Sequence, residues 1–231
     1  MKIHISTFYK SNISDYLLFY QKQVFKMLGL ELNQICDNDI SHGDFMTRIL
    51  RDTEADYFVI FDIDCIPLKK EAISRVIEEI KDNTISGCAQ TAKHFNNGKN
   101  IYVGPCFFAI SKEVYNLLGR PDLNENKVLE VDAGGILSKL APEYGVKLNY
   151  WYPTDVEEEK WELYPDKVFG IGTTYEGLVY HLFESRYQKN IVKFIRKSNA
   201  TINNNWSLNP IKYAVIKLEI LLFKIKMRSQ K

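Results

Sequence analysis

Hydrophobic residues recur along this chain with two different periods, and their pattern predicts strands separated by helices. Short apolar runs that favour β-strands occupy residues 2–6, 31–36, 57–61 and 85–90. Apolar positions at helical spacing, with Ser or Asp at two of the starts, occupy residues 14–28, 41–53 and 71–81. Because strands and helices alternate with short connections, we predict an α/β fold with a mostly parallel sheet.

The pattern becomes less regular after residue 90. Further strands and helices are predicted, in chain order, at residues 101–111, 113–118, 132–144 and 149–152. Two polar stretches predict irregular structure instead. Residues 155–161 are acidic and predict a loop, and the Asn-rich residues 198–210 predict a linker.

The run from Tyr57 to Asp64 is the most informative segment of the chain. Its five apolar residues, rich in β-branched and aromatic types, predict a strand buried on both faces of the sheet. Ionised carboxylates are costly inside such a sheet, so the chain must leave it at Asp62. Open α/β sheets bind ligands beyond the carboxyl ends of their strands. Asp62 and Asp64 therefore lie where a site is expected, close enough to share one divalent cation and its phosphates.

Size and composition set the limits. The 231 residues, 45% hydrophobic and 26% charged, suit one full core of an ordinary globular protein. The net charge of +1 hides an asymmetry, because residues 189–231 hold ten Lys or Arg against Glu219 alone. That segment carries +9 and the remainder −8. The four cysteines form no CxxC pair, so no zinc site is predicted.

The two carboxylates can be interpreted in three ways. In the first they merely end a strand or cap a helix, and in the second they form the Asp-x-Asp nucleophile motif of a haloacid-dehalogenase phosphatase. In the third they hold a metal on a nucleotide diphosphate. The phosphatase motif requires a small turn residue followed by Thr or Val, whereas Cys65 and Ile66 follow here. That motif also lies on the first strand of its family, whereas about 60 residues precede this one.

The third interpretation is supported by a resemblance. Residues 57–68 resemble the Asp-x-Asp segment of GT-A type glycosyltransferases, and the bacterial surface-polysaccharide enzymes are the closest of these. The resemblance spans about residues 1–187. Besides the opening strand it includes Gly104–Ser111, Val131–Gly135 and Tyr180–Phe183.

The resemblance implies a GT-A fold, a Rossmann-like mixed sheet flanked by helices, with a helical basic C-terminal tail. It implies a catalytic domain at residues 1–188 and a C-terminal extension at 189–231. Within the domain, residues 1–90 would form the nucleotide-binding half and residues 91–188 the acceptor-binding half.

The resemblance also implies metal ligands. Asp64 would bind the metal directly, and Asp62 would contact the ribose or a metal-bound water. His181 matches a late His that supplies a third ligand, although a lone His is equally compatible with a core or surface position. Oxygen ligands with one imidazole favour Mn²⁺ or Mg²⁺, with Mn²⁺ preferred because it accepts nitrogen more readily.

Other candidate residues follow from the same comparison. Thr7, Phe8 and Tyr9 end the first strand, where this fold receives the base and ribose, although such aromatics also pack under loops. Asp132 matches the acidic position that deprotonates an acceptor hydroxyl, with Glu130 as a backup. Asp132 also suits a helix N-cap. Trp151 and Trp161 either present flat platforms for sugars or pack in the core, and the sequence does not decide between these two roles.

A separate prediction concerns the C-terminal segment of the chain. Residues 211–228 combine an apolar arc with lysines and predict a helix that lies on an anionic membrane surface or packs on protein. The long apolar run argues against nucleic acid as a partner. No signal peptide or uninterrupted apolar stretch of about 18 residues is visible. We therefore expect a cytoplasmic protein, peripheral on the inner face of the membrane.

Together these features predict a metal-dependent, hexosyltransferase-like glycosyltransferase. It would move a sugar from a nucleotide sugar, UDP-linked by preference, to a saccharide or lipid-linked acceptor in surface polysaccharide assembly. Two alternatives remain: a nucleotidyltransferase, which needs a Gly-rich phosphate loop after the first strand, or an inactive interaction protein with this fold.

Overall fold

The computed structural model describes residues 1–92, 94, 100–163, 166–203 and 218. Its elements are β1 (Ile3–Tyr9), α1 (Asp15–Met27), β2 (Asn33–Cys36), α2 (His42–Asp52), β3 (Tyr57–Asp62), β4 (Cys65–Pro67), α3 (Glu71–Glu79), β5 (Thr84–Thr91), β6 (Ile101–Ser111), α4 (Lys112–Leu117), α5 (Gly135–Leu140), η2 (Ala141–Tyr144), β7 (Lys147–Trp151), β8 (Pro153–Leu163), β9 (Lys167–Tyr175), β10 (Val179–His181) and α6 (Gln188–Asn203).

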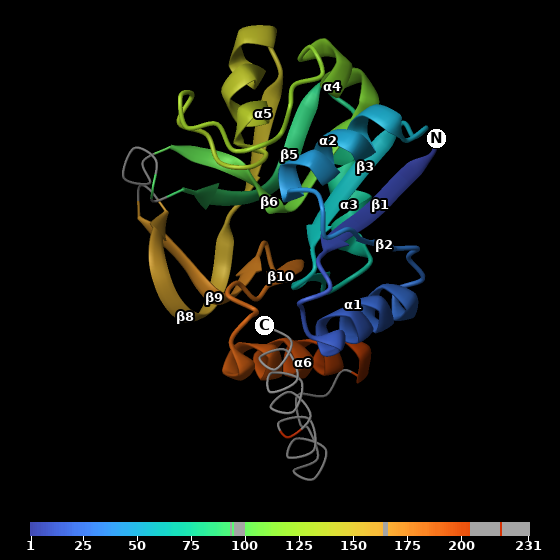
Figure 1. The fold of residues 1–231 in the computed structure, drawn as a ribbon, viewed down its shortest axis with the longest axis vertical. Helices are drawn as coiled ribbons and strands as arrows, with labels where there is room; N and C mark the ends of the chain where they lie inside the picture. Colours follow the sequence, from blue (N-terminus) through green and yellow to red (C-terminus); the bar gives the residue numbers. More distant parts are fainter. Residues whose placement is uncertain (93, 95–99, 164–165, 204–217, 219–231) are drawn as a thin grey trace.

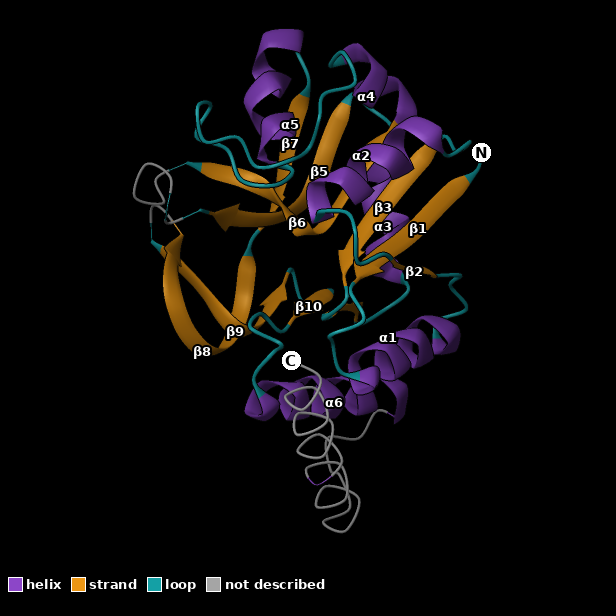
Figure 2. Ribbon diagram, in the orientation of Figure 1, coloured by secondary structure: helices purple, strands orange, loops and turns teal. Residues whose placement is uncertain are grey.

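Six strands form the central sheet in the order β2-β1-β3-β6-β5-β7. Strands β2, β1 and β3 are parallel, as are β5 and β7, whereas β6 runs antiparallel to both of its neighbours. Helices cover the sheet, as Figures 1 and 2 show. The predicted fold class, α/β with a mixed sheet flanked by helices, is therefore confirmed.

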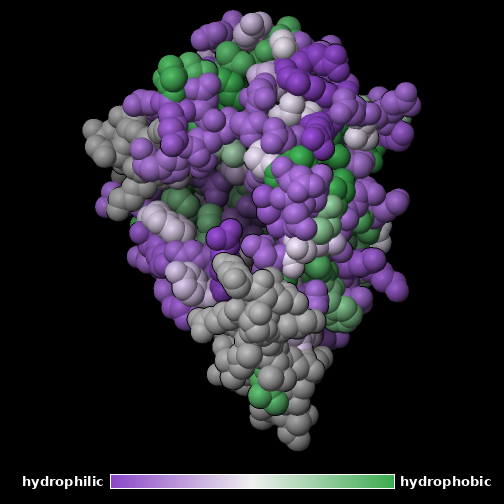
Figure 3. Space-filling view, in the orientation of Figure 1, coloured by the Kyte–Doolittle hydropathy of each residue, from purple (hydrophilic) through white to green (hydrophobic). Residues whose placement is uncertain are grey.

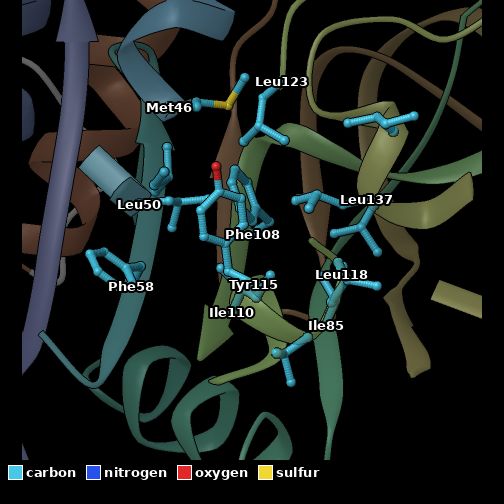
Figure 4. Close-up of a cluster of buried hydrophobic side chains, with 14 of the residues drawn as sticks. Met46, Leu50, Phe58, Ile85, Phe108, Ile110, Tyr115, Leu118, Leu123 and Leu137 are labelled. Carbon is cyan, nitrogen blue, oxygen red and sulfur yellow. The ribbon is translucent and has the colours of Figure 1, made fainter. Parts of the chain in front are cut away.

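Alternate residues of β3 enter two separate cores. Phe58 and Ile60 pack into the cluster formed with α2, α4 and α5, part of which is drawn in Figure 4. Val59 and Phe61 face the opposite way, into the cluster formed with α3. All four side chains are completely buried. A central strand covered on both faces needs apolar residues at every position, which is why the run is uninterrupted.

A second sheet, in the order β4-β10-β9-β8, was not predicted. The acidic residues 155–161 lie within strand β8, so the prediction of a loop there is wrong. Strand β8 is at the edge of its sheet and pairs only with β9 among the described strands, with two register shifts. Charged residues are tolerated on an edge strand because its side chains face solvent, and pairing with a neighbour outweighs their low strand propensity.

Helix α6 packs on the body of the molecule. Ile191, Phe194 and Ile195 join Leu17 and Val24 of α1 in one buried cluster, and Figure 1 shows the two helices together. The predicted linker is therefore wrong for residues 198–203, which remain helical because α6 is held by this packing.

The charge asymmetry of the sequence is partly used inside the molecule. Lys193 of α6 lies 3.4 Å from Glu158 and 3.6 Å from Glu157, both on β8.

None of the described helices combines the length and apolar character needed to cross a bilayer. The predicted membrane-binding segment, residues 211–228, lies outside the described residues except for residue 218, and the division of the chain at residue 188 stays a prediction.

Helix α2 begins with a reciprocal cap. The Asp44 backbone N–H donates to Ser41 Oγ at 2.9 Å, and the Ser41 backbone N–H donates to the Asp44 carboxylate at 3.0 Å. Asn124 Nδ2 also donates to Asp44 at 2.8 Å. The hydrogen bond from Asn124, followed by those from Ser41, lowers the pKa of Asp44 to about 2. Asp44 is thus a structural residue that ties α2 to a distant loop.

We expect Asp44→Ala to lower the free energy of unfolding by about 1 kcal/mol near neutral pH, because the cap is lost. The folded-state pKa lies below the unfolded value, so this contribution is present above about pH 4 and disappears as the pH falls towards 2. Urea denaturation of wild type and variant at several pH values measures it. The control Asp52→Ala removes a charge at the unfavourable carboxyl end of the same helix. A stability difference that did not shrink in acid would contradict the prediction.

Candidate functional site

The two carboxylates lie at the carboxyl end of the central strand. Strand β3 ends at Asp62, and a tight turn leads through Asp64 into β4. Gln21, a buried residue of α1, holds this turn by donating from Nε2 to the backbone oxygens of Asp62 (2.8 Å) and Cys65 (2.9 Å). The position predicted from the sequence is therefore the observed one, and α1 helps to position it.

His181 is brought to the carboxylates by the second sheet. Strand β10 pairs with β4 so that His181 lies opposite Cys65. His181 Nε2 is 3.1 Å from Asp64 Oδ1 and 3.6 Å from Asp62 Oδ2. One ligand-type atom from each of the three residues lies within 4.8 Å of the others. Residues 117 positions apart in the chain thus meet at one point.

Burial makes the charges of this cluster expensive. Burial raises the pKa of Asp62, and His42 and His181 offset this only in part. Burial opposes ionisation of Asp64 as well, but His181 outweighs it and lowers the pKa of Asp64. Burial would lower the pKa of His181, yet Cys106 and Asp64 raise it well above its usual value. Asp64 is buried and Asp62 is partly buried, and the imidazoles of His42 and His181 lie beside them. Two neighbouring carboxylates in such surroundings are stabilised by a cation placed between them.

This donor set fits a hard or borderline divalent cation. Two carboxylates and one imidazole nitrogen are ligands typical of Mn²⁺, and the carboxylates also suit Mg²⁺. The three residues also line one cavity, which offers space for phosphate oxygens and water. His181 is thus neither a surface residue nor remote from the carboxylates.

A cavity of about 990 Å³ opens beside the three residues. Asp62, Asp64 and His181 lie in its lining together with Asp132. Part of its wall is formed by the β8–β9 hairpin, and the face drawn in Figure 3 is hollowed next to this hairpin. Ligand pockets of proteins typically reach about 300–1,000 Å³, so this cavity is large enough for a substituted sugar.

Asp132 is not a helix cap. The residue at the N-cap of α5 is Gly134, whose φ is 78° and which contributes no side-chain hydrogen bond. The Asp132 carboxylate instead accepts from the Tyr102 hydroxyl at 3.1 Å and from the Ala133 backbone N–H at 2.8 Å. Burial and the charge of Asp132 raise the pKa of Tyr102 well above its usual value, so this hydroxyl remains a donor. The capping alternative is therefore excluded.

A second cavity of about 520 Å³ adjoins the first, and Asp132 and Tyr102 line both. The backup residue Glu130 lines only this second cavity. His94 and Glu125 lie beside Asp132, with ligand-type atoms of the three within 4.8 Å of one another. Asp132 thus stands between two spaces, where a carboxylate can contact molecules in both.

The residues predicted to bind the nucleotide lie next to the carboxylates but outside the lining of the large cavity. Phe8 is paired with Asp62 in the sheet, and its ring stacks on those of His42 and Phe45. Thr7 has no exposed surface, and Tyr9 is partly buried in the α1–α6 cluster. Contact of these three residues with a nucleotide therefore stays a prediction.

Sequence reasoning missed His42, Gln21 and Tyr102 as parts of the site. His42 Nε2 lies 3.4 Å from Asp62 Oδ1, yet its position at the start of a helix carries no signal beyond a capping motif. Gln21 lies within an ordinary amphipathic helix, and Tyr102 within a long apolar strand. Only the folded chain reveals that His42 lies beside the Asp62 carboxylate, that Gln21 holds the backbone of the turn, and that Tyr102 donates to Asp132.

No protein-family model and no curated protein sequence matches this chain. Among solved structures, it is similar to a putative nucleotide-diphospho-sugar transferase from Desulfovibrio desulfuricans G20, with 9% identity, a TM-score of 0.44 and coverage of 66% of this chain and 80% of that one. It is also similar to a CMP:2-keto-3-deoxy-manno-octonic acid synthetase complexed with CTP (10% identity, TM-score 0.41, coverage 66% and 90%). A third is 4-diphosphocytidyl-2C-methyl-D-erythritol synthase from Anaerococcus prevotii DSM 20548 (12% identity, TM-score 0.42, coverage 64% and 88%). Likeness at this level assigns no substrate, so function is argued from the site.

Proposed function

We propose that this protein is a divalent-metal-dependent glycosyltransferase. It transfers a sugar from a nucleotide sugar, UDP-linked by preference, to a saccharide or glycolipid acceptor in surface polysaccharide assembly. The observation that carries the proposal is the convergence of Asp62, Asp64 and His181 at the end of the central strand, next to a cavity that also exposes Asp132. A metal-binding cluster and a separate carboxylate in one cavity are what activation of a leaving group and of a nucleophile require.

The metal would be Mn²⁺, or Mg²⁺, held by Asp64 and His181, with Asp62 as a further ligand or as the partner of a metal-bound water. When bound, it would neutralise the charge that develops on the departing nucleoside diphosphate, a contribution of several kcal/mol. Thr7, Phe8 and Tyr9 would contact the base and ribose, because they end the strand adjacent to β3. These assignments keep the donor at the carboxyl edge of the sheet.

Asp132 would accept the proton of the acceptor hydroxyl as that oxygen attacks the sugar. The hydrogen bonds from Tyr102 and Ala133 orient its carboxylate. Its place between the two cavities lets it contact an acceptor without belonging to the metal cluster. This division of roles separates leaving-group stabilisation from nucleophile activation.

The segment after β1 favours sugar transfer over nucleotidyl transfer. Residues 10–14 contain no glycine, and the first glycine of the chain is Gly29. Ser11 is tied to Asn38, whose Oδ1 accepts from the Ser11 backbone N–H at 2.9 Å. A loop that wraps a triphosphate with its backbone N–H groups needs glycine for close approach.

Thermal unfolding tests the proposal directly. We expect Mn²⁺ to raise the melting temperature and UDP to raise it further only when Mn²⁺ is present. Saturation at about 100 times the dissociation constant corresponds to about 2.7 kcal/mol, or about 5–11 °C for a chain of this length. Assays for UDP release from UDP-sugars and for pyrophosphate release from nucleoside triphosphates with sugar phosphates accompany it. Pyrophosphate release would identify a nucleotidyltransferase, and no shift with any nucleotide would contradict both enzymatic functions.

A further inference from the structure

An aromatic group lines the large cavity beside the proposed metal-binding cluster of Asp62, Asp64 and His181. Trp161 of β8, Phe169 of β9 and Phe183 after β10 all line this cavity. Their ring centroids are 5.2–5.5 Å apart, so each ring contacts the other two. Phe169 is buried and anchors the group, whereas Trp161 and Phe183 are partly exposed. The two exposed rings form a surface that we call the aromatic platform.

Trp161 differs in this respect from Trp151. The Trp151 ring is fully buried against Phe107 and Arg75, and its indole N–H donates to Glu79 at 2.8 Å. Trp151 therefore packs in the core. Trp161 is the tryptophan of this pair that reaches the cavity.

The backbone that presents the platform is strained. Phe183 and Glu184 are consecutive non-glycine residues with φ values of 57° and 45°. Bulky residues rarely adopt this conformation, and it persists where the surrounding structure enforces it, often at functional sites. Two sets of hydrogen bonds hold this conformation. Lys160 Nζ donates to both Glu184 carboxylate oxygens at 2.7 Å, and the Leu182 backbone N–H donates to the Asp64 backbone oxygen at 3.0 Å.

The strained backbone at Phe183 and Glu184 places the Phe183 ring beside His181. The Phe183 ring lies 3.7 Å, centroid to centroid, from the ring of the metal-ligand candidate His181. Trp161 contacts Phe183, with ring centroids 5.4 Å apart. The platform therefore begins beside the proposed metal-binding cluster and continues to Trp161 along the lining of the same cavity, where a second substrate would have room.

Charge in this part of the cavity disfavours an anionic ligand. The described lining residues include six carboxylates and two lysines: Asp62, Asp64, Asp132, Glu162, Asp166, Glu184, Lys160 and Lys167. Lys160 is paired with Glu184, and its Nζ also lies over the Trp161 ring, 5.7 Å from the ring centroid, so a sugar would share the indole with this ammonium. Glu162 and Asp166 still outnumber Lys167, the other lysine of the lining. A bound divalent cation would compensate only the carboxylates that hold it. The ligand that suits this wall is a neutral ring with an apolar face and polar edges.

We propose that Trp161 and Phe183 stack against the ring of a neutral hexose that serves as the acceptor, with its hydroxyls towards the charged groups of β8 and β9. The inference rests on the proposed function for its reaction, but the platform is a binding site that does not require metal or nucleotide. An aromatic ring is a flat, largely apolar surface, which suits the C–H face of a pyranose.

Titration of the full chain with simple saccharides, followed by calorimetry, tests this without a reaction. We expect wild-type protein to bind methyl hexosides and N-acetylhexosaminides in the millimolar range and to bind glucuronate more weakly. We expect Trp161→Ala to weaken binding of the neutral hexosides by about tenfold, and Trp161→Phe by no more than about threefold, since an aromatic ring is retained. The control Phe19→Ala truncates an exposed aromatic residue of α1 outside the cavity and leaves binding unchanged.

Three results would contradict the proposed role of the aromatic platform. Wild-type protein would bind none of the neutral hexosides at tens of millimolar, or would bind glucuronate more tightly than the neutral hexosides. In the third, Phe19→Ala would weaken hexoside binding as much as Trp161→Ala does. In the same samples, the Mn²⁺-dependent shift caused by UDP must survive Trp161→Ala. Loss of that shift would make Trp161 a stacking partner of the base instead. If wild-type protein showed no Mn²⁺–UDP shift but bound hexosides through Trp161, the proposed function would fail and the platform would stand.

Discussion

Asp64→Asn is expected to reduce turnover by at least about a thousandfold and to abolish the Mn²⁺-dependent effect of UDP on the melting temperature. The metal's contribution to leaving-group departure is several kcal/mol, and each 1.36 kcal/mol corresponds to tenfold in rate. An amide is a poor ligand for a divalent cation compared with a carboxylate, so binding and catalysis are lost together. UDP-release kinetics with a UDP-sugar and thermal unfolding with Mn²⁺ and UDP measure both effects.

The fold is expected to survive this change. The amide relieves the repulsion that Asp64 exerts on Asp62, and its oxygen can still accept from His181 Nε2, which offsets part of the stability lost with the Asp64–His181 charge pair. The matched control is Asp56→Asn, which changes an exposed carboxylate immediately before the amino end of the same strand. Near-normal turnover of Asp64→Asn, or an equal loss in Asp56→Asn, would refute the assignment of the metal to the end of β3.

Asp132→Asn is expected to lower kcat by about 10²–10⁴-fold, the usual contribution of a general base. The melting-temperature shift caused by Mn²⁺ and UDP should persist, because Asp132 lies outside the metal-binding cluster. Tyr102 and Ala133 donate to different oxygens of Asp132. The amide oxygen of Asn can keep the hydrogen bond from the Ala133 N–H, and the amide NH2 can donate to the Tyr102 hydroxyl oxygen, so little stability is lost. Comparison of kcat with the Mn²⁺–UDP shift therefore separates loss of the base from loss of donor binding.

Glu130→Gln is the control for this assignment. Glu130 is two positions away and lines the second cavity, but it does not line the large one. We expect near-normal turnover of Glu130→Gln. The reverse result, with turnover lost in Glu130→Gln and retained in Asp132→Asn, would transfer the role of base to Glu130. Retention in both variants would contradict base catalysis by either residue.

The sequence predictions were correct where the residues that stabilise an element lie close together in the chain. Helix α1 begins after Ser14 and α2 after Ser41, as the capping residues indicated. Strand β6 spans residues 101–111, as the apolar run indicated. These features depend on neighbours in the chain and on whether both faces of a strand are buried, both of which leave a local pattern.

Errors occurred where another segment of the chain supplied the stabilising partner. Residues 155–161 form part of β8 because β9 supplies their hydrogen bonds, and residues 198–203 remain helical because α6 packs on α1. Asp132 precedes glycines in a pattern typical of a cap, yet Gly134 occupies the cap and Tyr102 holds the carboxylate. In each case tertiary contacts outweighed a modest local preference.

The sequence alone therefore determined that a buried strand ends in two carboxylates, since an unbroken apolar run followed by charged residues has one inexpensive arrangement in an α/β sheet. Only the tertiary structure decided what surrounds them. His181 reaches Asp64 because β10 pairs with β4, and Trp161 reaches the cavity because β8 pairs with β9. Strand pairing across such separations is set by the register of whole sheets, and no spacing within the chain encodes which side chains it will bring together.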